Sequence, residues 1–314
     1  MFLSCGDALF DLFSVRDHAS ASAPTAVTLS GNVGGSPMNV VVGLARMGHN
    51  TRYFTKLSSD VFGTKMKQYL TMNELDISLC VDTDLNTTLA IVDTNDDGSA
   101  NYVFYTDNTA DVSITEADLP AKLPEDVKVL HFGSYSTAAE PTSSSLISLA
   151  ERENGKRFIS YDPNLRTNVV PDMDKWHESF KRFAKTATLI KASDEDIATL
   201  YGEGSEEKFV ADCFGFGAEL VFITRGPEGS SGYSKNGQEY SAPGKSVKVV
   251  DTVGAGDTFQ AAILHHLATN NHISDSGGVQ GDVSLDDAVN FAMVAAAITC
   301  SRAGADMPWL KELE

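Results

Sequence analysis

The 314-residue sequence has little positive charge. Lysine and arginine number 24 against 43 aspartates and glutamates, so the formal net charge is −19. A surface with this balance repels the phosphates of nucleic acids and of anionic lipids, and the sequence therefore predicts neither as a partner. Apolar residues make up 42% and charged residues 21%, which is typical of a folded protein and too apolar for a disordered one.

Long apolar runs are also missing. The longest apolar stretch, residues 292–300, is about half the roughly 18 residues that a transmembrane helix needs. The first residues, MFLSCGD, contain no basic stretch, and Asp7 interrupts the apolar run, so we expect no signal peptide.

Paired cysteines are absent as well. No CxxC pair occurs, which argues against a zinc site or a disulfide scaffold and suits a reducing cytoplasm, where we expect the protein to reside. The cysteines lie far apart, at Cys5, Cys80, Cys213 and Cys300.

Apolar runs alternate with helical patterns along most of the chain. The runs are short, apolar at consecutive positions and bounded by polar residues, as strands covered on both faces should be. This alternation predicts a mostly parallel sheet with helices on both sides. The predicted strands are residues 2–5, 52–56, 127–131, 157–161, 188–191, 219–224 and 246–250. The predicted helices are residues 37–47, 60–72, 143–153, 174–185, 194–201, 206–215, 256–268 and 285–302.

Two stretches interrupt this alternation with extended segments. Residues 9–15 and 26–29 form one pair, and residues 88–93 and 101–105 form the other. The turn Asn95-Asp96-Asp97-Gly98 between the second pair favours a hairpin. These segments form either a flap beside a site or an edge hairpin of the main sheet, and the pattern alone does not decide between them.

The clearest chemical signal is DTVGAGDTF at residues 251–259, which follows a predicted strand and opens a helix. Small residues at a helix start let backbone N–H groups approach an anion, above all a phosphate. Asp257 places a carboxylate in that first turn, beside the expected phosphate. This position is explained if Asp257 takes a proton from a hydroxyl nucleophile. The alternative is a glycine turn with Asp257 as a cap.

A second signal lies near the amino terminus, where residues 31–39 read GNVGGSPMN. Paired glycines permit a close backbone approach, and Asn39 can donate to and accept from a polyol. Asp11 lies among Leu9, Phe10, Leu12 and Phe13, and a carboxylate in an apolar strand requires donors such as sugar hydroxyls. Its other interpretation is an outward-facing residue on an alternating strand.

The two motifs, in this order, resemble the signatures of the ribokinase-like (PfkB) carbohydrate kinases, and most closely those of bacterial fructokinases. The resemblance runs nearly from end to end. It includes SCGDALFDLF near the start, LSSDVFG at 57–63, FYTDNTAD at 104–111, YDPNLR at 161–166, IKASDED at 190–196 and ITRGPEG at 223–229. It implies a three-layer α/β/α fold with a mostly parallel sheet and a small β lid. We expect one domain over residues 1–314, with lid segments at about 9–33 and 86–111.

The resemblance also implies roles for individual residues. Asp257 would be the catalytic base, Gly254, Ala255 and Gly256 would form the anion hole, and Arg166 would face both the sugar and the phosphoryl group. The sugar would be held by Asp11, Gly34, Gly35, Asn39, Phe104 and Arg166. ATP would be bound by Lys191, Ser193, Asp196, Thr224, Gly226, Gly229, Gly254 and Gly256. A monovalent cation site, for K⁺, would use Asp251 and the carbonyls of Val253 and Gly304.

The implied reaction is transfer of a phosphoryl group from ATP, with Mg²⁺, to a sugar, and to fructose in particular. Asp196 is one methylene shorter than the glutamate usual in the family, which weakens its proposed role around Mg²⁺. Residues 101–111 contain no arginine, so the flap offers no clamp for an anionic substrate and a neutral sugar is favoured. The alternatives are ribose, 2-keto-3-deoxygluconate or a nucleoside as acceptor, or a catalytically silent binding protein. Exposed lid edges favour a homodimer.

Overall fold

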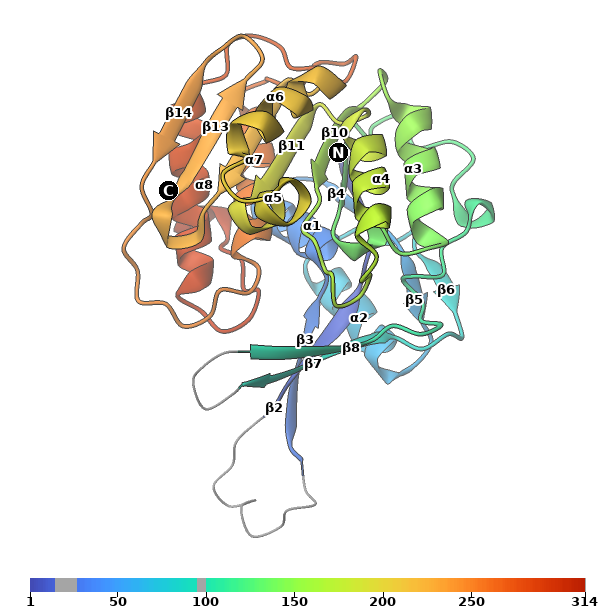
Figure 1. The fold of residues 1–314 in the computed structure, drawn as a ribbon. Helices are drawn as coiled ribbons and strands as arrows, with labels where there is room; N and C mark the ends of the chain where they lie inside the picture. The colour runs from blue at the N-terminus through green and yellow to red at the C-terminus, as the bar shows by residue number, and fades with distance from the viewer. Residues whose placement is uncertain (15–26, 95–99, 314) are drawn as a thin grey trace.

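The main sheet of the computed structural model, which describes residues 1–14, 27–94 and 100–313, has the strand order β14-β13-β12-β11-β10-β9-β1-β4 (Figure 1). All neighbours from β12 to β4 are parallel, and β13 and β14 add an antiparallel edge. The strands are Phe2–Cys5 (β1), Thr51–Phe54 (β4), Val129–Gly133 (β9), Phe158–Asp162 (β10), Leu189–Ser193 (β11), Leu220–Thr224 (β12), Ser230–Ser234 (β13) and Glu239–Ala242 (β14).

Helices cover both faces of this sheet (Figure 1). One face carries Ser36–Arg46 (α1), Ala255–Thr269 (α7) and Leu285–Cys300 (α8). The other carries Thr142–Glu153 (α3), Met173–Ala184 (α4), Asp194–Tyr201 (α5) and Glu206–Phe216 (α6). β9 and β10 are buried at every position, which confirms the predicted three-layer α/β/α arrangement. Within the described ranges, no helix has the length and apolar character that crossing a membrane requires.

A small sheet lies beside the main one and has the order β3-β2-β7-β8. In Figure 1 it extends below the three layers. Its strands are Leu9–Ser14 (β2), Leu29–Gly34 (β3), Thr88–Thr94 (β7) and Ala100–Tyr105 (β8), with Lys56–Ser58 (β5), Val61–Met72 (α2) and Val81–Thr83 (β6) nearby. The extended segments therefore form a sheet of their own, and their interpretation as an edge hairpin of the main sheet is wrong. The predicted turn at residues 95–98 lies outside the described residues.

The second strand of the small sheet differs from the prediction. We expected residues 26–29 to be extended, yet β3 runs from Leu29 to Gly34 and pairs antiparallel with β2 along its length. Glycine has a low intrinsic preference for strands, so the sequence pattern of Gly31 and Gly34 favoured a loop. Backbone pairing with β2 overrides that preference.

The strand predicted at residues 246–250 is wrong. This segment has no strand partner, and Val249 and Val250 are exposed despite their β-branched side chains. The edge of the sheet is instead the hairpin β13–β14, whose sequence is too polar and rich in serine to suggest strands. Serine and glycine are small enough to be buried in β13, so this strand forms without the apolar run that marks a central strand.

Asp60 joins α2 to the start of the small sheet. Its Oδ1 accepts hydrogen bonds from Phe62 N (2.9 Å), Gly63 N (2.8 Å) and Thr87 Oγ1 (2.8 Å), and its Oδ2 accepts one from Thr87 N (2.8 Å). Burial alone would raise the pKa of Asp60, but the bonds from Gly63 and Thr87 outweigh it and hold the pKa below its usual value. The ionised carboxylate therefore stabilises the fold.

We predict that Asp60→Ala lowers the free energy of unfolding by about 1–2 kcal/mol at pH 7, because α2 loses its cap. The difference from the wild type is full above the unfolded pKa of about 4 and shrinks as pH falls through the lower folded pKa. Urea unfolding at several pH values measures it. Ser59→Ala, one residue earlier, is the control, and equal stability losses in both variants would contradict this account.

Candidate active site

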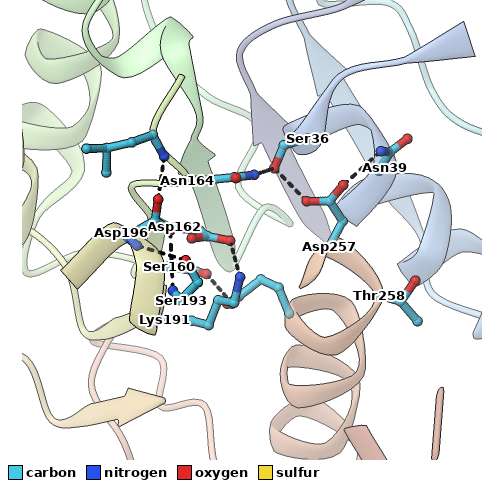
Figure 2. A network of polar contacts seen from close by, with 12 residues as sticks. Ser36, Asn39, Ser160, Asp162, Asn164, Lys191, Ser193, Asp196, Asp257 and Thr258 are labelled. Carbon is cyan, nitrogen blue, oxygen red and sulfur yellow. Dashed lines mark hydrogen bonds and ion pairs between the residues drawn. The ribbon is translucent and has the colours of Figure 1, made fainter. Parts of the chain in front are cut away.

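The carboxyl ends of the parallel strands meet at one edge of the main sheet, together with the first turns of α1 and α7. Asp162 ends β10, and Ser193 and Thr224 end β11 and β12 as register partners. In open α/β sheets, ligands bind in the crevice at this edge. Residues that are far apart in the sequence are thereby brought together (Figure 2).

The start of α7 is built for close approach of an anion. Gly254 has φ 77°, and a Cβ there would lie 2.6 Å from the Ala305 Cβ, so only glycine fits. No side chain caps the helix at Gly254. The first-turn N–H groups and the positive end of the helix dipole therefore form a site that favours negative charge.

Asp257 lies in this first turn, and α1 holds both of its oxygens. Ser36 Oγ donates to Oδ1 at 2.6 Å, and Asn39 Nδ2 donates to Oδ2 at 2.8 Å (Figure 2). Ser36 and Asn39 are three residues apart and so share one face of α1. Only 6% of Asp257 is exposed. Both carboxylate oxygens are thus held in fixed positions, from which one can accept a proton from a hydroxyl placed beside it.

Asn164 supports this arrangement from the loop after β10. Its Nδ2 donates to Ser36 Oγ at 2.8 Å, which leaves the hydroxyl hydrogen of Ser36 directed at Asp257. Asn164 has φ 38°, a left-handed conformation that asparagine tolerates better than most residues. The backbone at this site is held in an uncommon conformation that places the amide beside α1.

A buried ion pair lies on the other side of α7. Lys191 Nζ contacts Asp162 Oδ2 at 2.9 Å, and their side chains are 5% and 0% exposed. Burial lowers the pKa of Lys191, but Asp162 outweighs it and raises the pKa, so the ammonium stays charged. Nζ lies 3.0 Å from where a Cβ on Gly256 would be, so the cation reaches the start of α7. Asp162 Oδ1 has no hydrogen-bond partner in the described structure.

The small sheet presents Asp11 toward the same region. Strand register places Asp11, Asn32, Ala90 and Phe104 on one face. A Cβ on Gly34 would lie 2.3 Å from Asp11 Oδ2, so glycine is what leaves space for the carboxylate.

Nearby charges and an aromatic contact define the environment of Asp11 and Phe104. Burial raises the pKa of Asp11 to about 6, opposed by Arg166, with Asp251 and Asp257 adding to the rise. The guanidinium of Arg166 also donates to Leu165 O at 2.8 Å. Phe104 packs edge-on against Tyr135 with ring centroids 6.4 Å apart.

The predicted nucleotide-binding residues gather at the ends of β11 and β12. Gly226 and Gly229 have φ 49° and 109° in the turn that follows Thr224. Asp196 has a structural task, because its Oδ1 accepts from Leu165 N (2.9 Å) and its Oδ2 from Ser193 N (3.3 Å). Ser193 Oγ accepts from Asp196 N (3.0 Å), which completes a capping box on α5.

The residues predicted to bind the monovalent cation also lie next to one another. Asp251 Oδ1 accepts from Val253 N at 3.1 Å and Oδ2 from Gly304 N at 2.9 Å. The carboxylate thus joins the loop before α7 to the loop after α8. In the part of the chain that the structure describes, no group of three or more His, Cys, Asp or Glu side chains could hold a metal ion.

Sequence reasoning missed three members of this site: Ser36, Asp162 and Asn164. Ser36 precedes Asn39 by three residues, so helical spacing could have shown that both side chains share a face. Asp162 and Asn164 lie inside the YDPNLR block, where a polar run directly after a buried strand marks a strand end at a ligand-binding edge.

We predict that Lys191→Met costs about 3–5 kcal/mol of stability, because it leaves the Asp162 carboxylate buried and unpaired. Urea unfolding at pH 8 measures the loss. Lys128→Met is the matched control, since Lys128 pairs with Asp275 in an exposed ion pair (2.7 Å) and should lose little. Similar stability for the two variants would show that the buried pair contributes no more than a surface one.

Comparison with known proteins agrees with this geometry. The model of the pfkB family carbohydrate kinases matches residues 2–312. The chain is 38% identical over 274 residues to a fructokinase from Rhizobium leguminosarum bv. trifolii, covering 86% of this chain and 81% of the relative. It is 31% identical over 308 residues to fructokinase-2 from Zea mays, covering 97% and 90%.

Solved structures show the same fold over nearly the whole chain. An uncharacterized sugar kinase from Pyrococcus horikoshii superimposes with a TM-score of 0.83 at 26% identity, covering 99% of this chain and 96% of that one. A fructokinase double mutant from Vibrio cholerae, bound to fructose, ADP and potassium, gives a TM-score of 0.81 at 26% identity, with the same coverage. The chain belongs to the PfkB family of carbohydrate kinases and is a phosphotransferase that acts on a sugar hydroxyl.

Proposed function

We propose that this kinase transfers the γ-phosphoryl group of ATP to D-fructose, giving fructose 6-phosphate and ADP. The observation that carries the proposal is the carboxylate of Asp257, held by Ser36 and Asn39 at the mouth of the α7 anion site. Asp257 takes the proton of the sugar's primary hydroxyl as its oxygen bonds to the γ-phosphorus. The bond to the bridging oxygen breaks, and that oxygen leaves with ADP.

The surrounding residues stabilise the transferred group. Backbone N–H groups of the Gly254–Ala255–Gly256 turn face the developing charge in a site with few waters, where such donors act strongly. Lys191 reaches this turn and Arg166 approaches from the sugar side. ATP lies along Ser193, Asp196, Thr224, Gly226 and Gly229, whose glycines allow the backbone to follow the phosphates.

Two metal ions complete the proposed chemistry. The unpartnered, buried Oδ1 of Asp162 would hold Mg²⁺, which prefers such oxygens and would neutralise part of the phosphate charge. Both oxygens of Asp196 already accept backbone N–H groups, so its part is to hold the loop of Leu165. Asp251, with the backbone of Val253 and Gly304, would hold potassium and thereby fix the two loops that flank α7.

The small sheet acts as a lid on one kinase domain over residues 1–314, from segments at about 9–33 and 86–111. Asp11 and Asn39 hold sugar hydroxyls, Gly34 and Gly35 allow the sugar close to the backbone, and Phe104 packs on its apolar side. Closure excludes water, which would otherwise accept the phosphoryl group in place of the sugar. The absence of arginine in residues 101–111 supports a neutral acceptor over a phosphorylated one.

Removal of the proposed base tests the mechanism. We predict that Asp257→Asn lowers kcat by about 10²–10⁴-fold, because the sugar hydroxyl loses its proton acceptor. Coupled measurement of ADP release gives kcat and both KM values. Asp286→Asn changes an acid in the first turn of another helix, α8, and should keep normal turnover. Near-normal kcat in Asp257→Asn would contradict the assignment of Asp257 as the catalytic base.

A panel of acceptors tests the substrate. Fructose, ribose, 2-keto-3-deoxygluconate and a nucleoside are each incubated with ATP, Mg²⁺ and K⁺, and ADP is measured. We expect the highest kcat/KM with fructose, since the pocket offers a carboxylate, an amide and an aromatic ring, and residues 101–111 add no arginine to Arg166. If fructose gave only the rate without sugar while another acceptor reacted, the fructose assignment would be wrong; no reaction with any would favour a binding protein.

We further propose a cytoplasmic homodimer. All four cysteines are unpaired, which suits a reducing compartment. The face of the small sheet opposite Asp11 is apolar, and part of it is exposed: Leu29 by 40%, Val103 by 46% and Tyr105 by 56%. An apolar sheet face of this kind needs a cover, and a second copy of the same sheet provides one.

We predict that light scattering gives twice the mass of one chain for the wild type, and that Val103→Glu shifts it to the mass of one chain, because a charge enters the apolar face. Val294→Glu, at an exposed valine on α8, should remain dimeric. A monomeric wild type at working concentrations would contradict the proposal.

A further inference from the structure

Asp7 is a buried carboxylate between β1 and β2 that the proposed reaction does not use. Only 1% of the residue is exposed. Its Oδ2 accepts a hydrogen bond from the backbone N of Ser36 at 3.3 Å, and its Oδ1 has no hydrogen-bond partner in the described structure. A buried carboxylate with an unpartnered oxygen is costly, so its presence requires a reason.

The start of α1 offers that reason, because the helix has no cap of its own. The N-cap position is Gly35, no side chain caps the helix, and its first turn contains no acidic residue. From the segment between β1 and β2, Asp7 supplies an oxygen that accepts from one of the free N–H groups at this helix start.

Backbone contacts hold Asp7 tightly against this turn. A Cβ on Gly35, at φ 121°, would lie 2.4 Å from Asp7 O, so the two segments touch directly. Tyr53 Oη donates to the same carbonyl at 2.5 Å and fixes it from the neighbouring strand, β4. The Gly35–Ser36 turn therefore cannot move without moving Asp7.

We propose that Asp7 is a positioning residue for phosphoryl transfer, which fixes the Gly35–Ser36 turn so that α1 holds the base Asp257 in place. The connection has two steps: Asp7 binds the Ser36 backbone, and the side chains of Ser36 and Asn39 bind the two oxygens of Asp257. This inference rests on the proposed role of Asp257.

The burial of Asp7 with one oxygen unpartnered indicates that this carboxylate costs stability. Burial raises the pKa of Asp7 to about 7, the Asp111 carboxylate raises it further, and Ser136 and the more distant Arg166 lower it. The phenols of Tyr53 and Tyr135 also lie close enough for the charge of Asp7 to raise their pKa values, and Tyr53 donates to the Asp7 carbonyl. An acid with a raised pKa destabilises the fold as pH rises from about 4 to about 7, and the full penalty remains above that range.

The substitution Asp7→Asn should therefore lower kcat while thermal stability stays equal or rises. We expect kcat to fall about 10–100-fold, since a misplaced base loses rate, with little change in the KM for either substrate. The thermal midpoint at pH 8 should match or exceed that of the wild type, with the advantage shrinking toward pH 5. Glu153→Gln is the control: this buried acid is paired with Arg152 and Arg157, far along the chain, and should lose stability with normal kcat.

A double-mutant cycle tests whether Asp7 affects kcat through α1. If Asp7 acts through α1, Asp7→Asn costs little further kcat in the Ser36→Ala/Asn39→Ala background. Additive losses would overturn the inference, as would a wild-type kcat in Asp7→Asn, or a change confined to the sugar KM, which would make Asp7 a sugar ligand. Asp257→Asn is measured in parallel. If that variant stays active, Asp257 is not the base. If it is inactive while Asp7→Asn is unaffected, only the positioning role of Asp7 is wrong.

Discussion

The structure depends on one contact, in which the first turn of α1 holds a carboxylate in the first turn of α7. Two helix starts lie at the same edge of a parallel sheet, so both positive dipole ends and the side chains of Ser36 and Asn39 surround Asp257. This environment fixes a carboxylate beside a site for phosphate. The glycines of the α7 turn and the chain segment at Asp7 both serve to keep these helix starts close together.

The net charge of −19 opposes the binding of ATP, because ATP is itself an anion. Binding must then come from local groups: backbone N–H donors at the α7 turn, the buried ammonium of Lys191 and the guanidinium of Arg166. Lys191 keeps its charge through Asp162, so even this cation depends on a second acid.

Sequence reasoning placed the layers of the fold and Asp257 because both have strong local signals: buried apolar strands, and a glycine turn followed by an acid. It placed β3 too early and put a strand at residues 246–250, since strand pairing is decided by partners that are distant in the chain. Ser36, Asn164 and Asp7 were missed as site residues for a related reason. Local patterns could have drawn attention to Ser36 and Asn164, but the partners of all three residues lie more than 25 positions away and are set by the fold.

A crystal structure with fructose and a non-hydrolysable ATP analogue would test the central claim most directly. The account predicts that the sugar's primary hydroxyl lies within about 2.6–3.2 Å of an Asp257 oxygen. It also predicts that the γ-phosphate rests on the N–H groups of the Gly254–Gly256 turn, with Ser36 and Asn39 still bound to Asp257. A γ-phosphate bound elsewhere, or a primary hydroxyl facing a different acid such as Asp11 or Asp162, would contradict it.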